Sequence, residues 1–146
     1  MKKFTLFLAI LFCAYSATAE VPNIRLVIET QVSRSVAIGQ TAIWVARSFA
    51  SPSTVIQLYD SQSGLLIANG SMKVGTLDEN FSFSFEAKDK KVRVTLLSLY
   101  INTTIPGLAR MNITDDTSGY KEDSGPKIQA LLDDYKAFLS NYSQDF

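Results

Sequence analysis

The stretch "NFSFSFEAKD", residues 80–89, decides the fold. Aromatic and polar residues alternate along it at every position from Phe81 to Glu86. Because successive side chains of a β-strand point to opposite faces, this tract predicts a strand with one apolar and one polar face. The apolar face carries Phe81, Phe83 and Phe85, and the polar face carries Ser82, Ser84 and Glu86. The aromatic row needs to be buried, so other parts of the chain have to cover it.

Four other segments have the composition of strands, with β-branched and aromatic residues bounded by turn residues. They are residues 21–30, 54–60, 65–74 and 92–101. The last segment follows the turn "DKK", residues 89–91. It presents Val92, Val94 and Leu96 on one face, and Arg93 and Thr95 on the other.

Two amphipathic helices are also predicted. The first covers residues 35–50, is capped by Ser33 or Ser35, and ends before Pro52. The second starts at residues 124–126, where Ser124 is a cap candidate and Pro126 suits the first turn. Apolar residues recur at helical spacing in both, at Ile38, Ala42, Val45 and Phe49 near Trp44, and at Ile128, Leu131, Leu132, Tyr135, Phe138, Leu139 and Tyr142.

The order of these segments predicts an α+β fold. We expect a curved antiparallel sheet of about five strands, with one helix after the first strand and one C-terminal helix packed on one face. Residues 20–146 are expected to form a single domain. Residues 102–124 are expected to form a long loop. Because structureless loops are usually shorter, we expect this loop either to contain a short strand or turn or to be mobile.

The first 19 residues have the layout of a secretory signal peptide. Lys2 and Lys3 precede an apolar stretch, and Ala17 and Ala19 are the small residues of a cleavage site. A membrane anchor and lipoprotein processing at Cys13 are the alternatives, although the bulky Phe12 disfavours the second. The sequence therefore predicts secretion across the inner membrane, to the periplasm or the extracellular space, with no integral membrane segment after cleavage.

Composition excludes several kinds of chemistry from the exported chain. Cleavage removes Cys13, the only cysteine, and the sequence has no histidine. Disulfides, thiol nucleophiles and imidazole groups are therefore unavailable, and we expect no cofactor and no metal site. Because loss of Lys2 and Lys3 leaves acidic residues in slight excess, the charge does not favour nucleic acid.

The glycines of "DSQSGLLIANGSMKV", residues 60–74, raise the question of a phosphate-binding loop. Such loops place closely spaced glycines between a strand and the N-terminus of a helix. Here the glycines are widely spaced and strand-like residues follow them. We interpret Gly64 as the positive-φ residue of a hairpin turn and Gly70 as a bulge or strand irregularity.

The polar face of the predicted sheet is the best candidate for a binding site. Its candidate residues are Ser82, Ser84, Arg93 and Thr95. If both helices cover the other face, these side chains line an open polar surface that can receive a peptide or glycan, with an ordinary solvated sheet face as the alternative.

Other polar groups support weaker hypotheses. Four acidic residues of the long loop form either a calcium site or a solvated acidic surface. The solvated surface is favoured, because the loop lacks the EF-hand pattern of a calcium site. They are Asp115, Asp116, Glu122 and Asp123. Asp133 and Asp134 belong to the polar side of the last helix. Sequons occur at Asn69, Asn80, Asn102, Asn112 and Asn141, which we interpret as polar turn and strand residues.

Three stretches resemble a bacterial exported family, a domain of unknown function with a TATA-binding-protein-like (TBP-like) fold. They are "WVARSF", "VIQLYDSQSGLLIANGSMKV" and "EAKDKKVRVTLLSLY". The matching residues are Trp44, Ile56, Gln57, Asp60, Ser63, Gly64, Leu66 or Ile67, Gly70, Lys88, Asp89, Arg93 and Thr95. The resemblance spans residues 24–100 and implies a helix lying across a curved antiparallel sheet and a periplasmic location. It brings no activity.

Together these observations favour a non-catalytic binding or accessory module that uses an exposed sheet face or edge. Its partner would be a protein, a peptide or a glycan. One alternative is an enzyme using carboxylates and Arg93 without His or Cys, which requires two carboxylates beside Arg93 in one pocket. Another is a carrier of a small apolar ligand, which requires a large cavity between helix and sheet.

Overall fold

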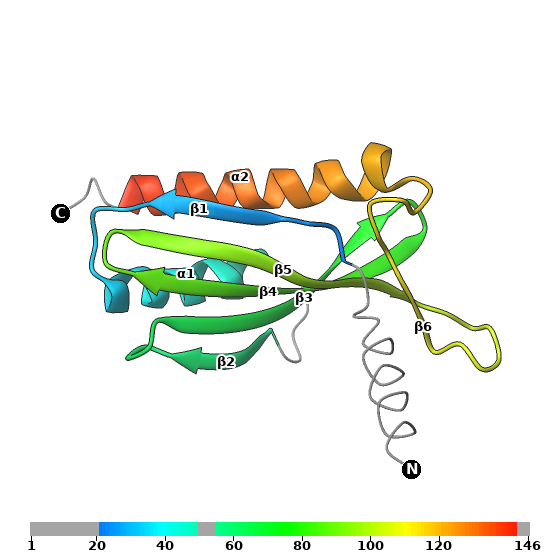
Figure 1. The fold of residues 1–146 in the computed structure, drawn as a ribbon, viewed down its shortest axis with the longest axis horizontal. Coiled ribbons are helices and arrows are strands. Elements are labelled where there is room, and N and C mark those ends of the chain that lie inside the picture. The colour runs from blue at the N-terminus through cyan, green and yellow to red at the C-terminus, as the bar shows by residue number, and fades with distance from the viewer. Residues whose placement is uncertain (1–20, 50–54, 143–146) are drawn as a thin grey trace, which may run out of the picture.

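The computed structural model describes residues 21–49 and 55–142 (Figure 1). The predicted signal peptide, residues 1–19, and the predicted helix stop at Pro52 lie outside them. The elements are β1 Arg25–Glu29, α1 Arg34–Ser48, β2 Ile56–Asp60, β3 Leu65–Val74, β4 Leu77–Lys88, β5 Lys91–Asn102, β6 Arg110–Asn112, the π-helical turn η1 Tyr120–Ser124, and α2 Gly125–Tyr142.

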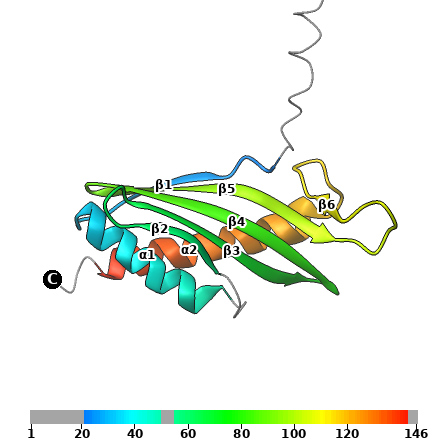
Figure 2. The same cartoon turned by 90° about the horizontal axis from the view of Figure 1, so that it is seen from below.

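The strands form one antiparallel sheet in the order β1-β5-β4-β3-β2. The short strand β6 pairs with the end of β5 that extends beyond β1. Both helices lie on the same face of the curved sheet, and no helix of the described residues lies on the opposite face (Figure 2). The predicted α+β class, with a helix after the first strand and a C-terminal helix on one face, is therefore confirmed.

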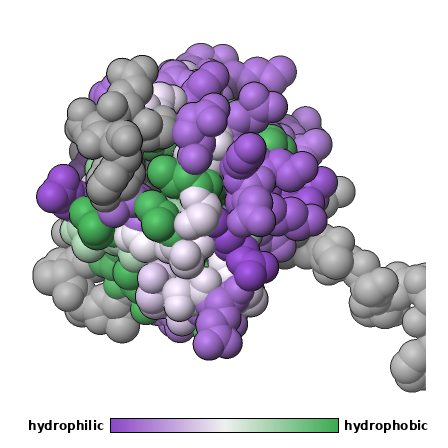
Figure 3. All heavy atoms as spheres, turned by 90° about the vertical axis from the view of Figure 1, so that its left-hand side faces the viewer, coloured by the Kyte–Doolittle hydropathy of each residue, from purple (hydrophilic) through white to green (hydrophobic). Residues whose placement is uncertain are grey.

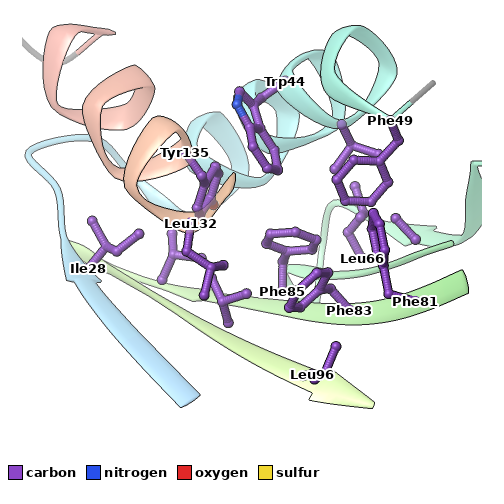
Figure 4. Packing of buried hydrophobic residues seen from close by; sticks show 14 of the residues in the cluster. Ile28, Trp44, Phe49, Leu66, Phe81, Phe83, Phe85, Leu96, Leu132 and Tyr135 are labelled. Atoms are coloured by element: carbon purple, nitrogen blue, oxygen red, sulfur yellow. The ribbon is translucent and has the colours of Figure 1, made fainter. Parts of the chain in front are cut away.

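The aromatic row of β4 forms the centre of the core. Phe81, Phe83 and Phe85 are at most 3% exposed and point toward the two helices (Figure 4). The ring centroids of Phe85 and Tyr135 of α2 are 5.2 Å apart, and those of Phe81 and Phe49 are 5.1 Å apart. Edge-to-face contacts at such distances are favourable for aromatic rings. The burial predicted for β4 is confirmed, and α1 and α2 supply the cover.

A polar link joins α1 to α2 above this core. The Tyr135 hydroxyl is 2.7 Å from Oγ1 of Thr41, which in turn donates to the carbonyl of Ala37. Burial raises the pKa of Tyr135 far above its ordinary value, so the phenol stays protonated. Nearby, Nε1 of Trp44 donates to Oδ2 of Asp134 at 2.8 Å. Asp134 lies on the exposed side of α2, as expected, and also satisfies the buried indole.

The turn between β2 and β3 answers the question of a phosphate loop. The Asp60 carboxylate accepts hydrogen bonds from the backbone N–H groups of Gln62 and Ser63. Gly64 has φ +72° and leads directly into β3, which pairs with β2. A Cβ at this glycine would lie 2.4 Å from the carbonyl oxygen of Ala87. The segment is a β-hairpin turn packed on β4, as predicted.

Gly70 has a different role from the predicted bulge. Pairing between β3 and β4 is continuous through it, with Gly70 directly opposite Phe81. A Cβ at this position would lie 2.6 Å from Cζ of Phe81 and 3.0 Å from Cδ2 of Phe49. The missing side chain therefore makes room for an aromatic ring that folds back over the strand. The bulge interpretation was wrong.

One bulge lies instead at Leu97 in β5, and a second register irregularity lies between Ile56 and Leu58 of β2. Ser82 pairs with Ser98 and Phe83 pairs with Leu96, so Leu97 has no partner in β4. Leu97 is 43% exposed, whereas Leu96 and Leu99 are buried. The extra residue changes which positions face inward, so the rest of β5 continues the polar face at Ser98.

The predicted long loop, residues 102–124, contains both β6 and η1. Ser124, expected to cap α2, instead donates from its hydroxyl to Oε1 of Glu79 at 2.7 Å. Glu79 is 5% exposed, and its other oxygen, Oε2, has no hydrogen-bond partner in the described part of the chain. This contact ties the start of α2 to β4.

Two glycine substitutions are expected to have opposite effects on stability. Gly70→Ala should lower the free energy of unfolding by about 1–3 kcal/mol, because the methyl group overlaps the Phe81 ring. In α1, a Cβ at Gly39 meets Tyr59 Oη at 3.7 Å, an ordinary contact. Gly39→Ala should therefore raise stability by up to about 1 kcal/mol. Urea unfolding measures both, and a neutral Gly70→Ala would contradict this packing.

The hairpin turn predicts a low pKa for Asp60. Hydrogen bonds from the Ser63 side chain and from the Ser63 and Gln62 backbones stabilise its charged form. In a carboxyl NMR titration, Asp60 should titrate below an ordinary aspartate, and Ser63→Ala should raise its pKa. Because the folded-state pKa is depressed, its stabilising effect is present above the unfolded pKa and is lost as pH falls through the folded one. The control Ser61→Ala should leave the titration unchanged.

Candidate functional site

All four predicted site residues lie on the face of the sheet opposite α1 and α2. Ser84 pairs with Thr95 across β4 and β5, Ser82 pairs with Ser98, and Arg93 pairs with Glu86. Each is half-buried, as expected for side chains in the middle of a wide sheet. The structure therefore places them on one surface, here called the open face.

Arg93 is already engaged by a neighbour. Its Nε donates to Oε2 of Glu86 at 2.6 Å, and Nη2 contacts the same oxygen. The two hollows of the described surface that include Arg93 contain a single carboxylate, that of Glu86. The pair of carboxylates that the enzyme hypothesis requires beside Arg93 is not found among these residues.

A larger hollow, of about 360 Å³, lies further along the open face. It spans β3, β4, β5 and β6, and among the predicted residues only Ser82 lines it. Its lining residues are Asn69, Gly70, Ser71, Asn80, Phe81, Ser82, Ser98, Tyr100 and Arg110. We call this the amide–hydroxyl hollow, because most of its side chains carry one of these groups.

The central part of the hollow comes from two sequons that face each other. Asn69 of β3 pairs with Ser82 of β4, and Ser71 of β3 pairs with Asn80 of β4. In a strand, residues i and i+2 share a face, so each N-x-S triplet projects both its polar side chains outward. Antiparallel pairing then sets each asparagine beside the serine of the other strand. These two sequons are thus strand residues of a polar face, as expected, whereas Asn141 lies in α2 and not in a turn or strand.

The rim of the hollow is formed by β5 and β6. Arg110 lies over the Tyr100 ring, with its guanidinium carbon 4.6 Å from the ring centroid. Sequence reasoning missed Arg110, because β6 is a three-residue strand inside the predicted loop. It also missed Ser98 and Tyr100, since the bulge at Leu97 changes their face. Asn69 and Asn80 could have been found from the two sequons.

Charged residues gather at the other end of the open face. Lys88, Lys90 and Lys91 are exposed at the β4–β5 hairpin. Seen from that end, hydrophilic residues cover the side of the molecule where the open face lies, and hydrophobic residues gather on the helix side (Figure 3). The open face therefore has a charged end and a hollow lined mainly by neutral side chains.

The structure also bears on the hypotheses of a metal site, an apolar-ligand carrier and a membrane-spanning segment. The acidic residues of the loop are exposed, and in the described part of the chain no three Asp or Glu residues are arranged to hold a metal ion. Aromatic rings fill the space between helices and sheet around Phe85, where the apolar-carrier hypothesis requires a cavity (Figure 4). Neither described helix has the length and hydropathy needed to span a bilayer.

Comparison with known proteins shows that this fold also occurs in a solved bacterial structure. No protein-family model matches the sequence, and a search of curated proteins finds no match. The structure is similar to a DUF4468 family protein from Bacteroides ovatus, with a TM-score of 0.50 and 11% identity, covering 84% of this chain and 80% of that one. At that identity the similarity shows a shared fold. The expected resemblance to a bacterial domain of unknown function is confirmed at this level.

A second solved structure is described as a TBP-like protein from Parabacteroides distasonis. The similarity has a TM-score of 0.48 and 6% identity, and it covers 63% of this chain and 64% of that one.

The ion pair on the open face is expected to add little stability. The Arg93 and Glu86 side chains are each 42% exposed, so solvent screens their attraction. Arg93→Met should change the free energy of unfolding by less than about 1 kcal/mol, and the change should shrink at high salt. Arg25→Met, on the same face, is the matched control and should show no salt-dependent difference. A loss of several kcal/mol on removing Arg93 would contradict this weak pair.

Proposed function

We propose that this protein is a non-catalytic binding module that holds a glycan in the amide–hydroxyl hollow of the open face. In this proposal residues 1–19 direct export, and the module works in the periplasm or the extracellular space. The observation that carries the proposal is the pairing of Asn69 with Ser82 and of Asn80 with Ser71 in one hollow.

The hydrogen-bonding groups of the hollow favour a glycan over a peptide. A bound peptide usually adds a strand to a free edge, where unpaired backbone groups are available. Beneath this hollow the backbone groups of β3, β4 and β5 already pair with one another. What remains are side-chain amides and hydroxyls, which both donate and accept and so match the hydroxyl groups of a sugar.

The charge distribution argues against nucleic acid as the ligand. Proteins that bind nucleic acid present clustered cations to the phosphates, and their folds alone do not decide this. In the hollow, Arg110 is the single charged residue of the lining. The whole chain has 14 basic and 14 acidic residues. A hydroxyl-rich ligand with few charges is the better complement.

Glycan-array binding with matched variants tests the proposal. The double variant Asn69→Ala with Asn80→Ala removes two amides and should weaken binding at least about tenfold, since each lost hydrogen bond to a ligand costs about 1 kcal/mol. The control Ser84→Ala with Thr95→Ala changes the same face outside the hollow and should leave affinity unchanged. If no glycan binds, or both double variants bind like the wild type, the proposal is wrong.

A further inference from the structure

We infer that the glycan is acidic, and that Arg110 binds its carboxylate at the rim of the hollow. This inference rests on the proposed function and adds the chemical class of the ligand. It starts from the one cation in an otherwise neutral lining.

Arg110 has no anionic partner in the described part of the chain. The ion pairs formed there are Lys73 with Asp78 and Arg93 with Glu86. Arg93, the cation expected to bind a ligand, is therefore neutralised by its neighbour, whereas Arg110 is exposed and unpaired. A ligand anion at the hollow would meet Arg110 as its single counter-charge.

The position of Arg110 suits recognition of a planar anion. Its guanidinium lies over the Tyr100 ring, 4.6 Å from the centroid, and β6 holds the arginine in register opposite Asn102. A guanidinium in contact with an aromatic ring keeps its five N–H donors, and those of Arg110 have no carboxylate partner in the described part of the chain. Two parallel N–H groups match the two oxygens of a carboxylate, which gives this contact its specificity.

The rest of the lining limits the number of charges on the ligand. Asn69, Asn80 and Ser98 are neutral and offer hydrogen bonds alone. Burying a second anion near them would leave it without a counter-charge, which is unfavourable. The arrangement therefore suits a sugar with one carboxylate at the bound position, that is, a uronic acid unit flanked by hydroxyl groups.

The test compares uronate oligosaccharides with their neutral methyl esters by isothermal titration calorimetry. The panel contains galacturonate, glucuronate and mannuronate oligomers, with a sulfated dextran as a second kind of polyanion. The wild type should bind at least one acid form at least tenfold more tightly than its ester. Arg110→Gln should bring the acid to the affinity of the ester and leave the ester unchanged, while Arg110→Lys should retain part of the preference.

Lys88→Gln is the matched control, because it removes one positive charge from the same face outside the hollow. It should keep the full preference for the acid, and circular dichroism should show that all variants remain folded. Equal binding of acid and ester by the wild type, a preference that survives Arg110→Gln, or tighter binding of sulfated dextran would overturn the inference. If the esters bind and this binding depends on Asn69 and Asn80, glycan binding by the hollow stands although the inferred acidic ligand is wrong. If no oligosaccharide binds, the proposed function and the acidic ligand are both wrong.

Discussion

The strict alternation of β4 is the constraint on which the rest of the structure depends. Phe81, Phe83 and Phe85 cannot be left in water, since full burial of each such side chain contributes roughly 1.5–3 kcal/mol. Once they point toward α1 and α2, the residues between them have to point the other way. The same strand thus builds the core and the open face, and neither can be rotated without the other.

This coupling explains why the candidate site is both polar and rigid. Ser82 is anchored between two buried aromatic residues, and the paired strand β3 holds Asn69 beside it. The core also explains the glycine between the two polar residues of β3, since Gly70 has to admit the Phe81 ring. Side chains mounted on the middle strands of a packed sheet keep their relative positions, which is what a hydrogen-bonding surface needs.

Sequence reasoning identified the elements whose signal is local. The alternation of β4 and the helical stripe of α2 each extend over many residues, so they predict both the element and its buried side. The features that escaped prediction depend on distant partners. Gly70 is explained by Phe81 and Phe49, Asp134 by the indole of Trp44, and β6 by its pairing with the far end of β5. Glu79 is an intermediate case, because it continues the inward row of Phe81 and could have been recognised as buried.

The unpaired residue Leu97 works like a frame-shifting insertion in the pattern of β5. Before Leu97 the buried residues are the even-numbered Val92, Val94 and Leu96. After it, Leu99 is buried, whereas Ser98 and Tyr100 lie on the open face. If Leu97 were instead paired with β4 in an unbulged ladder, the two sets would be exchanged, and a tyrosine and a serine would enter the aromatic core. The fold and the ligand surface would be lost together. Related chains that keep this surface are therefore expected either to loop out one residue here, of any identity, or to lack that residue, because both arrangements leave Ser98 and Tyr100 facing outward.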